Sequence, residues 1–270
     1  MSQPPPAPPS ETDPDSKPVE WDAPPSPATA PDPPAEKPAP MPSAARALAT
    51  AAVVSGVVTV VSRFAPKSVA ATGVGLVFLA ATWFCTIRRD DGDAGQWGIS
   101  LGGLLDRERI SWPRVFKEAA IALAWTAALA LVFFPPFYFG YRHLWSPRHD
   151  FSFRMPGSIA DDVAGQLFVI ALPEEAFFRG YLQTALEAAW KPKVRILGAE
   201  LGLGWLVSAA VFAVGHVLTA PSPARLAVFF PALVFGYLRA RTRGIGAGVA
   251  FHAACNIYSA TLARGFGLPT

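Results

Sequence analysis

The sequence predicts an all-α membrane protein, a polytopic bundle of about seven transmembrane helices that follows a disordered, proline-rich N-terminal tail. Three observations predict this class. The chain has 270 residues, of which 51% are hydrophobic and only 16% are charged, whereas a soluble domain carries about a quarter charged residues. The mean hydropathy is +0.31. The first 43 positions are polar, so the remainder is more apolar than this mean indicates.

The N-terminal tail differs from the rest of the chain in composition. Residues 1–43 contain 16 of the 28 prolines, and seven acidic residues stand there against two lysines. Such a segment cannot bury enough apolar surface to offset the entropy of ordering it, so we expect disorder with polyproline character. The transmembrane domain is therefore expected at residues 44–270.

Seven apolar segments follow the tail, each long enough to cross a hydrocarbon core about 30 Å thick, which takes about 20 residues of helix. The third ends at the sequence FFPPFYF and the sixth contains Pro231. A proline inside a helix removes a backbone hydrogen bond, so we expect both segments to be kinked or interrupted. The segments are residues 44–62, 68–87, 119–139, 163–187, 201–220, 224–240 and 244–264.

The basic residues of the loops predict the orientation, because lysine and arginine collect on the cytoplasmic side. With alternating segments, one side carries twelve basic residues and the other seven, so the N-terminus is expected in the cytoplasm. The net charge of +3 is small and the basic residues are scattered, which gives no footprint for nucleic acid. The richer side has Arg88, Arg89, Arg107, Arg109, Arg114, Lys117, Lys191, Lys193, Arg195, Arg239, Arg241 and Arg243; the other has Arg63, Lys67, Arg142, Arg148, Arg154, Arg225 and Arg264.

A few polar side chains lie inside the apolar segments, where a charge costs about 2.5–3.5 kcal/mol at mid-bilayer and marks a functional candidate. They come from the fourth, fifth and seventh segments. They are Glu174, Glu175, Arg179, His216, His252 and Asn256.

Helix geometry relates these side chains. Glu175 and Arg179 are four residues apart, so they can pair on one face of a helix. Glu174 is rotated by about 100° from Glu175 and has no evident partner on its own helix. His252 and Asn256 also share a face. Considered one at a time, these residues could have purely structural roles. Glu175 and Arg179 could form a structural ion pair, and the histidines and the asparagine could join helices by hydrogen bonds.

Taken together, the set fits a peptidase that uses activated water. A carboxylate kept away from bulk water suits a general base, so Glu174 beside His216 could hold and deprotonate a water molecule. His252 and Asn256 could stabilise the oxyanion. A serine nucleophile is not favoured, because the G-x-S-x-G match GISLG at 98–102 lies in the polar loop after the second segment, outside the apolar segments that carry this set. A zinc site at Glu174, His216 and His252 is the competing chemistry, although H-E-x-x-H is absent and we favour a metal-free reaction.

Three motifs carry a resemblance to a known family. EEAFFR at 174–179, FAVGH at 212–216 and HAACN at 252–256 resemble the ordered motifs of the CAAX-protease and bacteriocin-processing family of intramembrane endopeptidases, over about residues 163–262. The resemblance implies that Glu174 is the catalytic glutamate and acts on water with His216, without a metal. It also implies that His252 and Asn256 form the oxyanion site, supported by Glu175 and Arg179.

Two longer stretches, ALPEEAFFRGYLQ and FFPALVFGYLRARTRGIGAGVAFHA, are similar to the myxosortase branch of this family. That similarity implies the processing of C-terminal sorting or anchor sequences, with a membrane-anchored protein as substrate. The alanine- and proline-rich composition is compatible with a high-GC bacterium, so the bacterial inner membrane is the expected location. Two other functions remain open from the residues alone: a proton-coupled transporter, and a non-catalytic immunity or scaffold protein.

Overall fold

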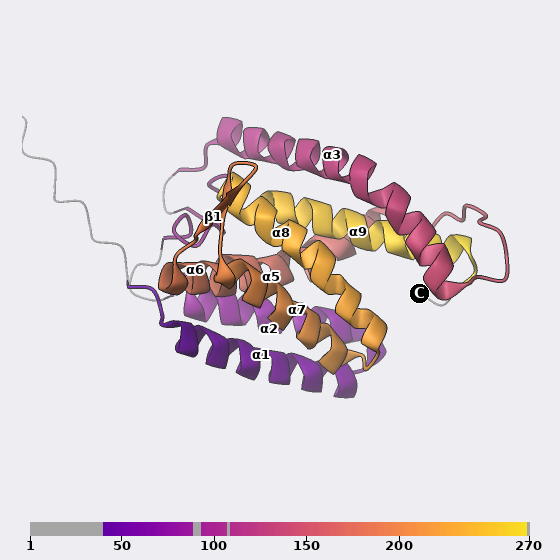
Figure 1. The fold of residues 1–270 in the computed structure, drawn as a ribbon, viewed down its shortest axis with the longest axis horizontal. Helices are drawn as coiled ribbons and strands as arrows, with labels where there is room; N and C mark the ends of the chain where they lie inside the picture. The colour runs from indigo at the N-terminus through magenta and orange to yellow at the C-terminus, as the bar shows by residue number, and fades with distance from the viewer. Residues whose placement is uncertain (1–39, 89–92, 107–108, 269–270) are drawn as a thin grey trace, which may run out of the picture. The chain divides into compact units, whose positions relative to one another are not determined.

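The computed structural model describes residues 40–88, 93–106 and 109–268, which belong to one compact unit (Figure 1). The disordered tail predicted for residues 1–43 lies outside the described residues as far as position 39. The described chain is almost entirely helical, and seven helical segments follow one another in it, as the sequence predicts.

The first two segments form an antiparallel pair, α1 (Ala44–Phe64) and α2 (Lys67–Cys85). The side chain of Ser43 accepts a hydrogen bond from the backbone N–H of Arg46. This contact satisfies one of the free amides with which every helix begins. Only Ala65 and Pro66 separate the two helices, so α2 must return directly along α1.

The third segment is α3 (Trp112–Trp145), which is 34 residues long and extends beyond the predicted 119–139 at both ends. It continues through Pro135 and Pro136, so no interruption occurs there. Figure 1 shows instead that the helix bends over its second half, as expected where proline rings crowd the preceding turn. Helix α9 packs beside this point, and the Tyr258 hydroxyl donates to the Phe134 carbonyl.

The fourth segment is one continuous helical run in which α-helical and wider π-helical turns alternate. The sequence predicted a helical segment at 163–187, which the structure confirms and extends at both ends, but it did not predict the π-helical turns. Pro173 has no N–H to offer the carbonyl of Val169, and that oxygen packs on α2 at Gly75, where a Cβ would lie 2.5 Å away. The parts are α4 (Ile159–Ala164), η1 (π-helical, Gly165–Ala171), α5 (Leu172–Glu175), η2 (π-helical, Ala176–Gln183) and α6 (Thr184–Trp190).

A short antiparallel hairpin, β1 (Val194–Ile196) and β2 (Ala199–Leu201), connects the fourth segment to the fifth. Leu197 and Gly198 form its turn with φ of +44° and +82°. The sequence did not predict this hairpin, because three-residue strands leave almost no periodic pattern.

The remaining helices are α7 (Leu203–Thr219), α8 (Phe229–Thr242) and α9 (Gly246–Gly265), with a 3₁₀ turn, η3 (Pro223–Val228), before α8. Pro231 lies in the first turn of α8, where its missing N–H interrupts no helical bond. The sixth segment is therefore divided at Phe229 and is not kinked at the proline.

The loops predicted to share one side of the membrane lie at the same end of the bundle. The N–H of Ile245, before α9, donates to the carbonyl of Gly98 in the α2–α3 loop at 2.9 Å. The Tyr237 hydroxyl donates to Leu197 in the hairpin. At the opposite end, Arg63 donates to the carbonyl of Leu218. These contacts support the alternation of segments on which the charge count depends.

Three of the described helices are long and apolar enough to cross a membrane by length and composition: α1, α2 and α3. Helix α7 is apolar but shorter. In the most apolar stretch of α3 only 6% of residues are buried inside the bundle, so most of this helix presents apolar side chains outward. A helix with an outward apolar surface is stable where lipid covers that surface. The chain is therefore a membrane protein.

Candidate active site

The centre of the bundle contains an ion pair between Glu175 and Arg179. The carboxylate Oε1 of Glu175 lies 3.1 Å from Nη1 of Arg179, and the two side chains are 0% and 1% exposed. The prediction that these two residues pair is confirmed. A charged pair this deeply buried requires further polar partners to offset the loss of hydration.

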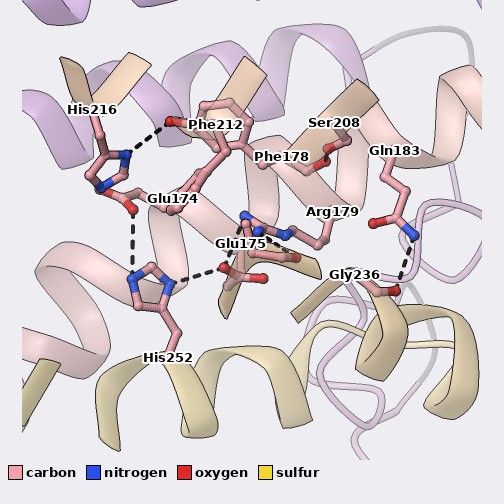
Figure 2. A network of polar contacts seen from close by, with 11 residues as sticks. Glu174, Glu175, Phe178, Arg179, Gln183, Ser208, Phe212, His216, Gly236 and His252 are labelled. Atoms are coloured by element: carbon pink, nitrogen blue, oxygen red, sulfur yellow. Dashed lines mark hydrogen bonds and ion pairs between the residues drawn. The ribbon is translucent and has the colours of Figure 1, made fainter. Parts of the chain in front are cut away.

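His252 supplies one such partner from α9 (Figure 2). Its Nδ1 lies 2.9 Å from Glu175 Oε1, a hydrogen bond in which the ring nitrogen donates when it carries the proton. Its Nε2 lies 3.8 Å from Glu174 Oε2, a distance longer than a hydrogen bond. The imidazole therefore faces both glutamates at once, which the sequence did not predict.

The guanidinium of Arg179 is fixed by α8 as well as by Glu175. Its NH2 donates to the carbonyl of Ala232 at 3.1 Å. Its Cζ lies 4.5 Å from the ring centre of Phe212 and 5.3 Å from that of Phe235. Contacts of a cation with aromatic faces are favourable, and more so away from water. Arg179 thus joins the glutamate helix to α7 and α8.

Glu174 and His216 lie on the more open side of this pair. The Glu174 side chain is 12% exposed, and its Oε2 is buried without a hydrogen-bond partner among the described residues. Figure 2 shows His216 and His252 pointing toward this carboxylate from α7 and α9. His216 contacts the carbonyl of Phe212 through Nδ1 at 3.0 Å, which leaves its Nε2 for another partner.

Asn256 lies one turn beyond His252 on α9 and is half-buried. Its side chain makes no hydrogen bond within residues 40–88, 93–106 and 109–268. The structure thus gathers Glu174, Glu175, Arg179 and His252 through direct contacts, and it leaves the Asn256 amide without one. A free amide is a suitable hydrogen-bond donor for a ligand oxygen.

The structure adds Phe235 to the residues around the site, and sequence reasoning could not have identified it. This residue is on α8, a helix that carries none of the predicted site residues, and its ring stacks on His252. One phenylalanine in an apolar segment has no pattern that distinguishes a contact with the site from ordinary packing.

The zinc alternative can be compared with this arrangement. Among the described residues, no three histidine, cysteine, aspartate or glutamate side chains are grouped as a metal-ligand set. His252 Nδ1 is already directed at Glu175, and Glu175 is paired with Arg179. These nitrogen and oxygen atoms thus bind one another. The metal-free reaction remains a prediction to be tested by experiment.

The fold and the buried cluster define the class first: this is a membrane protein with carboxylates and imidazoles collected inside a helical bundle. Residues 157–258 match the family model described as type II CAAX prenyl endopeptidase Rce1-like. These residues include every predicted site residue, and the match supports a domain of the CAAX-protease family in this part of the chain, with endopeptidase activity of the CAAX protease type. No curated protein and no solved structure matches the chain.

Proposed function

We propose that this protein hydrolyses a peptide bond near the membrane in the C-terminal sorting or anchor sequence of a membrane or surface protein, in the manner of a myxosortase. The proposed hydrolysis is supported mainly by the Glu174 carboxylate. Its buried Oε2 lacks a hydrogen-bond partner among the described residues and lies beside His252. The substrate class rests on the similarity of two sequence stretches to the myxosortase branch.

In the proposed reaction, Glu174 is the general base. It takes a proton from a water molecule that His216 also contacts through its free Nε2, and the water oxygen bonds to the carbonyl carbon of the substrate. The C–N bond then breaks, and the proton on Glu174 passes to the leaving amine. The products are a carboxylic acid and a free amine.

Asn256 and His252 are proposed to stabilise the negative oxygen of the intermediate. Asn256 would donate from its uncommitted amide, and preorganised donors of this kind commonly supply a large share of the rate. His252 would donate from Nε2, which its 3.8 Å contact with Glu174 leaves available. This role requires both ring nitrogens to carry protons, since Nδ1 is directed at Glu175.

Glu175 and Arg179 are proposed to support the site without touching the substrate. Both are essentially inaccessible, and both orient other groups: Glu175 contacts His252, and Arg179 contacts Glu175. We propose that no metal takes part; the support is that His252 Nδ1 contacts Glu175 and that Glu175 pairs with Arg179. Zinc at Glu174, His216 and His252 is the alternative to be tested.

We propose the bacterial inner membrane as the location, with the N-terminus in the cytoplasm. The support is the excess of basic residues at the end of the bundle that carries the hairpin and the α2–α3 loop. Positive charge of this kind is typically retained on the cytoplasmic side.

The function is tested by C-terminal peptide mass spectrometry of membrane and surface proteins from wild-type and Glu174→Gln cells. Glutamine keeps the shape of the side chain and removes the base, so truncated C-termini should disappear in this variant. Glu200→Gln, in the exposed part of the hairpin, is the matched control and should leave the peptides unchanged. The same C-termini in Glu174→Gln and wild-type cells would contradict the proposal.

A further inference from the structure

Phe235 of α8 makes the closest aromatic contact with His252. The two ring centres are 4.6 Å apart and the ring planes differ by 11°, so the rings are stacked face to face. The Phe235 ring is 2% exposed. Phe212 contacts the same imidazole from another direction, edge-on at 81° and 6.0 Å.

The stacking restrains the one torsion on which the site geometry depends. Rotation of a histidine ring about its last side-chain bond is soft, with broad wells. The orientation seen here sends Nδ1 to Glu175 and Nε2 toward Glu174. The stacked Phe235 ring, whose centre lies 4.6 Å from that of the imidazole, blocks rotation of the imidazole out of its plane. Without that ring, the hydrogen bond to Glu175 and the edge-on contact with Phe212 remain as the restraints on the imidazole.

The backbone around Phe235 is itself fixed from both sides. Arg179 donates to the Ala232 carbonyl at 3.1 Å, and Gln183 donates to the Gly236 carbonyl at 3.1 Å. A Cβ at Gly236 would lie 2.5 Å from Trp205 Cδ1, so α8 approaches its neighbours as closely as a glycine permits. Phe235 therefore has little freedom to move away from the imidazole.

We propose that Phe235 is a positioning residue of the hydrolytic site, which holds the His252 imidazole in the plane that faces Glu174 and Glu175. The proposal rests on the hydrolytic function proposed above. Phe235 acts through His252 and has no part in binding the substrate. The same ring lies 5.3 Å from the Arg179 guanidinium, so it contacts both partners of Glu175.

The test compares Phe235→Leu and Phe235→Met, which remove the flat ring, with Phe235→Tyr, which keeps it. Phe78→Leu is the matched control, because Phe78 is a comparably buried phenylalanine whose ring packs on Phe177 and Phe178 and, among the described residues, on no histidine ring. Each variant is purified in detergent, and folding is checked by gel filtration and thermal melting. Two aliphatic replacements are used so that a folding failure of one leaves the other.

Two measurements follow. With a cleaved substrate peptide, the aliphatic variants should lose about tenfold in kcat, the scale of one aromatic contact, with KM unchanged. Phe235→Tyr and Phe78→Leu should retain most of the kcat. Independently of activity, diethyl pyrocarbonate should modify His252 several-fold faster in the aliphatic variants than in wild type or Phe78→Leu, as read by peptide mass spectrometry.

Unchanged modification of His252 in folded Phe235→Leu or Phe235→Met would overturn the inference, as would a loss of activity equal to that of Phe78→Leu. A rise in KM with constant kcat would also overturn it, because it would assign Phe235 to substrate binding. These outcomes differ from failure of the proposed function, which would appear as cleavage that survives in Glu174→Gln. In that case the modification of His252 still decides the role of Phe235.

Discussion

Replacement of Arg179 by alanine should strongly lower the free energy of unfolding of the protein. The change leaves Glu175 buried with no cation, since its carboxylate oxygen loses a partner at 3.1 Å. It also removes the donor to the Ala232 carbonyl and the guanidinium between Phe212 and Phe235. Breaking a buried ion pair on one side costs about 3–5 kcal/mol. The total free energy of unfolding of a native domain is only about 5–15 kcal/mol, so the yield of folded protein should fall sharply.

The assay is the free energy of unfolding in mixed micelles, followed by tryptophan fluorescence during titration with a denaturing detergent. Arg195→Ala, on the exposed hairpin strand, should differ from wild type by no more than about 0.5 kcal/mol, as is usual for surface changes.

A double variant separates the charge from the packing. Glu175→Gln with Arg179→Met removes both charges and keeps similar volumes, and replacement of a whole buried pair is often neutral or stabilising. It should therefore be more stable than Arg179→Met alone. If Arg179→Ala costs less than about 1 kcal/mol, or if the double variant is less stable than the single one, the ion pair is not the source of stability.

Three further predictions concern chemistry and topology. Glu174→Gln should abolish cleavage while the melting temperature stays at the wild-type value, because the amide fits the same space; a large drop in melting temperature would reveal a structural role. A membrane-permeating chelator should leave the purified enzyme active, whereas activity lost with stoichiometric zinc and restored by its return would favour the zinc alternative. In spheroplasts of a background without Cys85 and Cys255, an impermeant thiol reagent should label Ser146→Cys and spare Ser111→Cys until lysis; the reverse pattern would invert the topology.

The sequence predicted the class, the seven segments and the Glu175–Arg179 pair because these depend on local composition and on spacing along one helix. The contact of His252 with Glu175 joins residues 77 positions apart, and no single sequence specifies how two helices rotate toward each other. The same limit applies to Phe235, whose role depends on which helix lies opposite.

Some local features also escaped prediction, for physical reasons. π-Helical turns lie on either side of Glu174 and Glu175, and the composition of the segment, that of an ordinary membrane helix, does not predict them. The ends of α3 lie beyond the predicted span because Trp112 and Trp145 continue the helix into polar surroundings. Hydropathy identifies the hydrocarbon crossing and not the end of the helix.

The length of α3 has a consequence for the depth of the site. Trp112 and Trp145, both more than half exposed, lie about 50 Å apart along the helix at about 1.5 Å per residue. A bilayer with its headgroup regions measures about 40–45 Å, so both indoles reach the interfaces they prefer only when α3 tilts or bends.

Helix α9 follows that tilt, because Phe134 of α3 stacks on Phe251, the neighbour of His252. Phe134 lies about 33 Å from Trp112 and about 17 Å from Trp145 along α3. We therefore expect the two tryptophans, held at the two interfaces, to determine the depth of His252 below each membrane surface. A thicker bilayer would reduce the tilt of α3 and increase the depth of the His252 imidazole below the membrane surface at Trp145. Bilayer thickness would then affect the geometry of the proposed site through α3, a helix that carries none of the site residues.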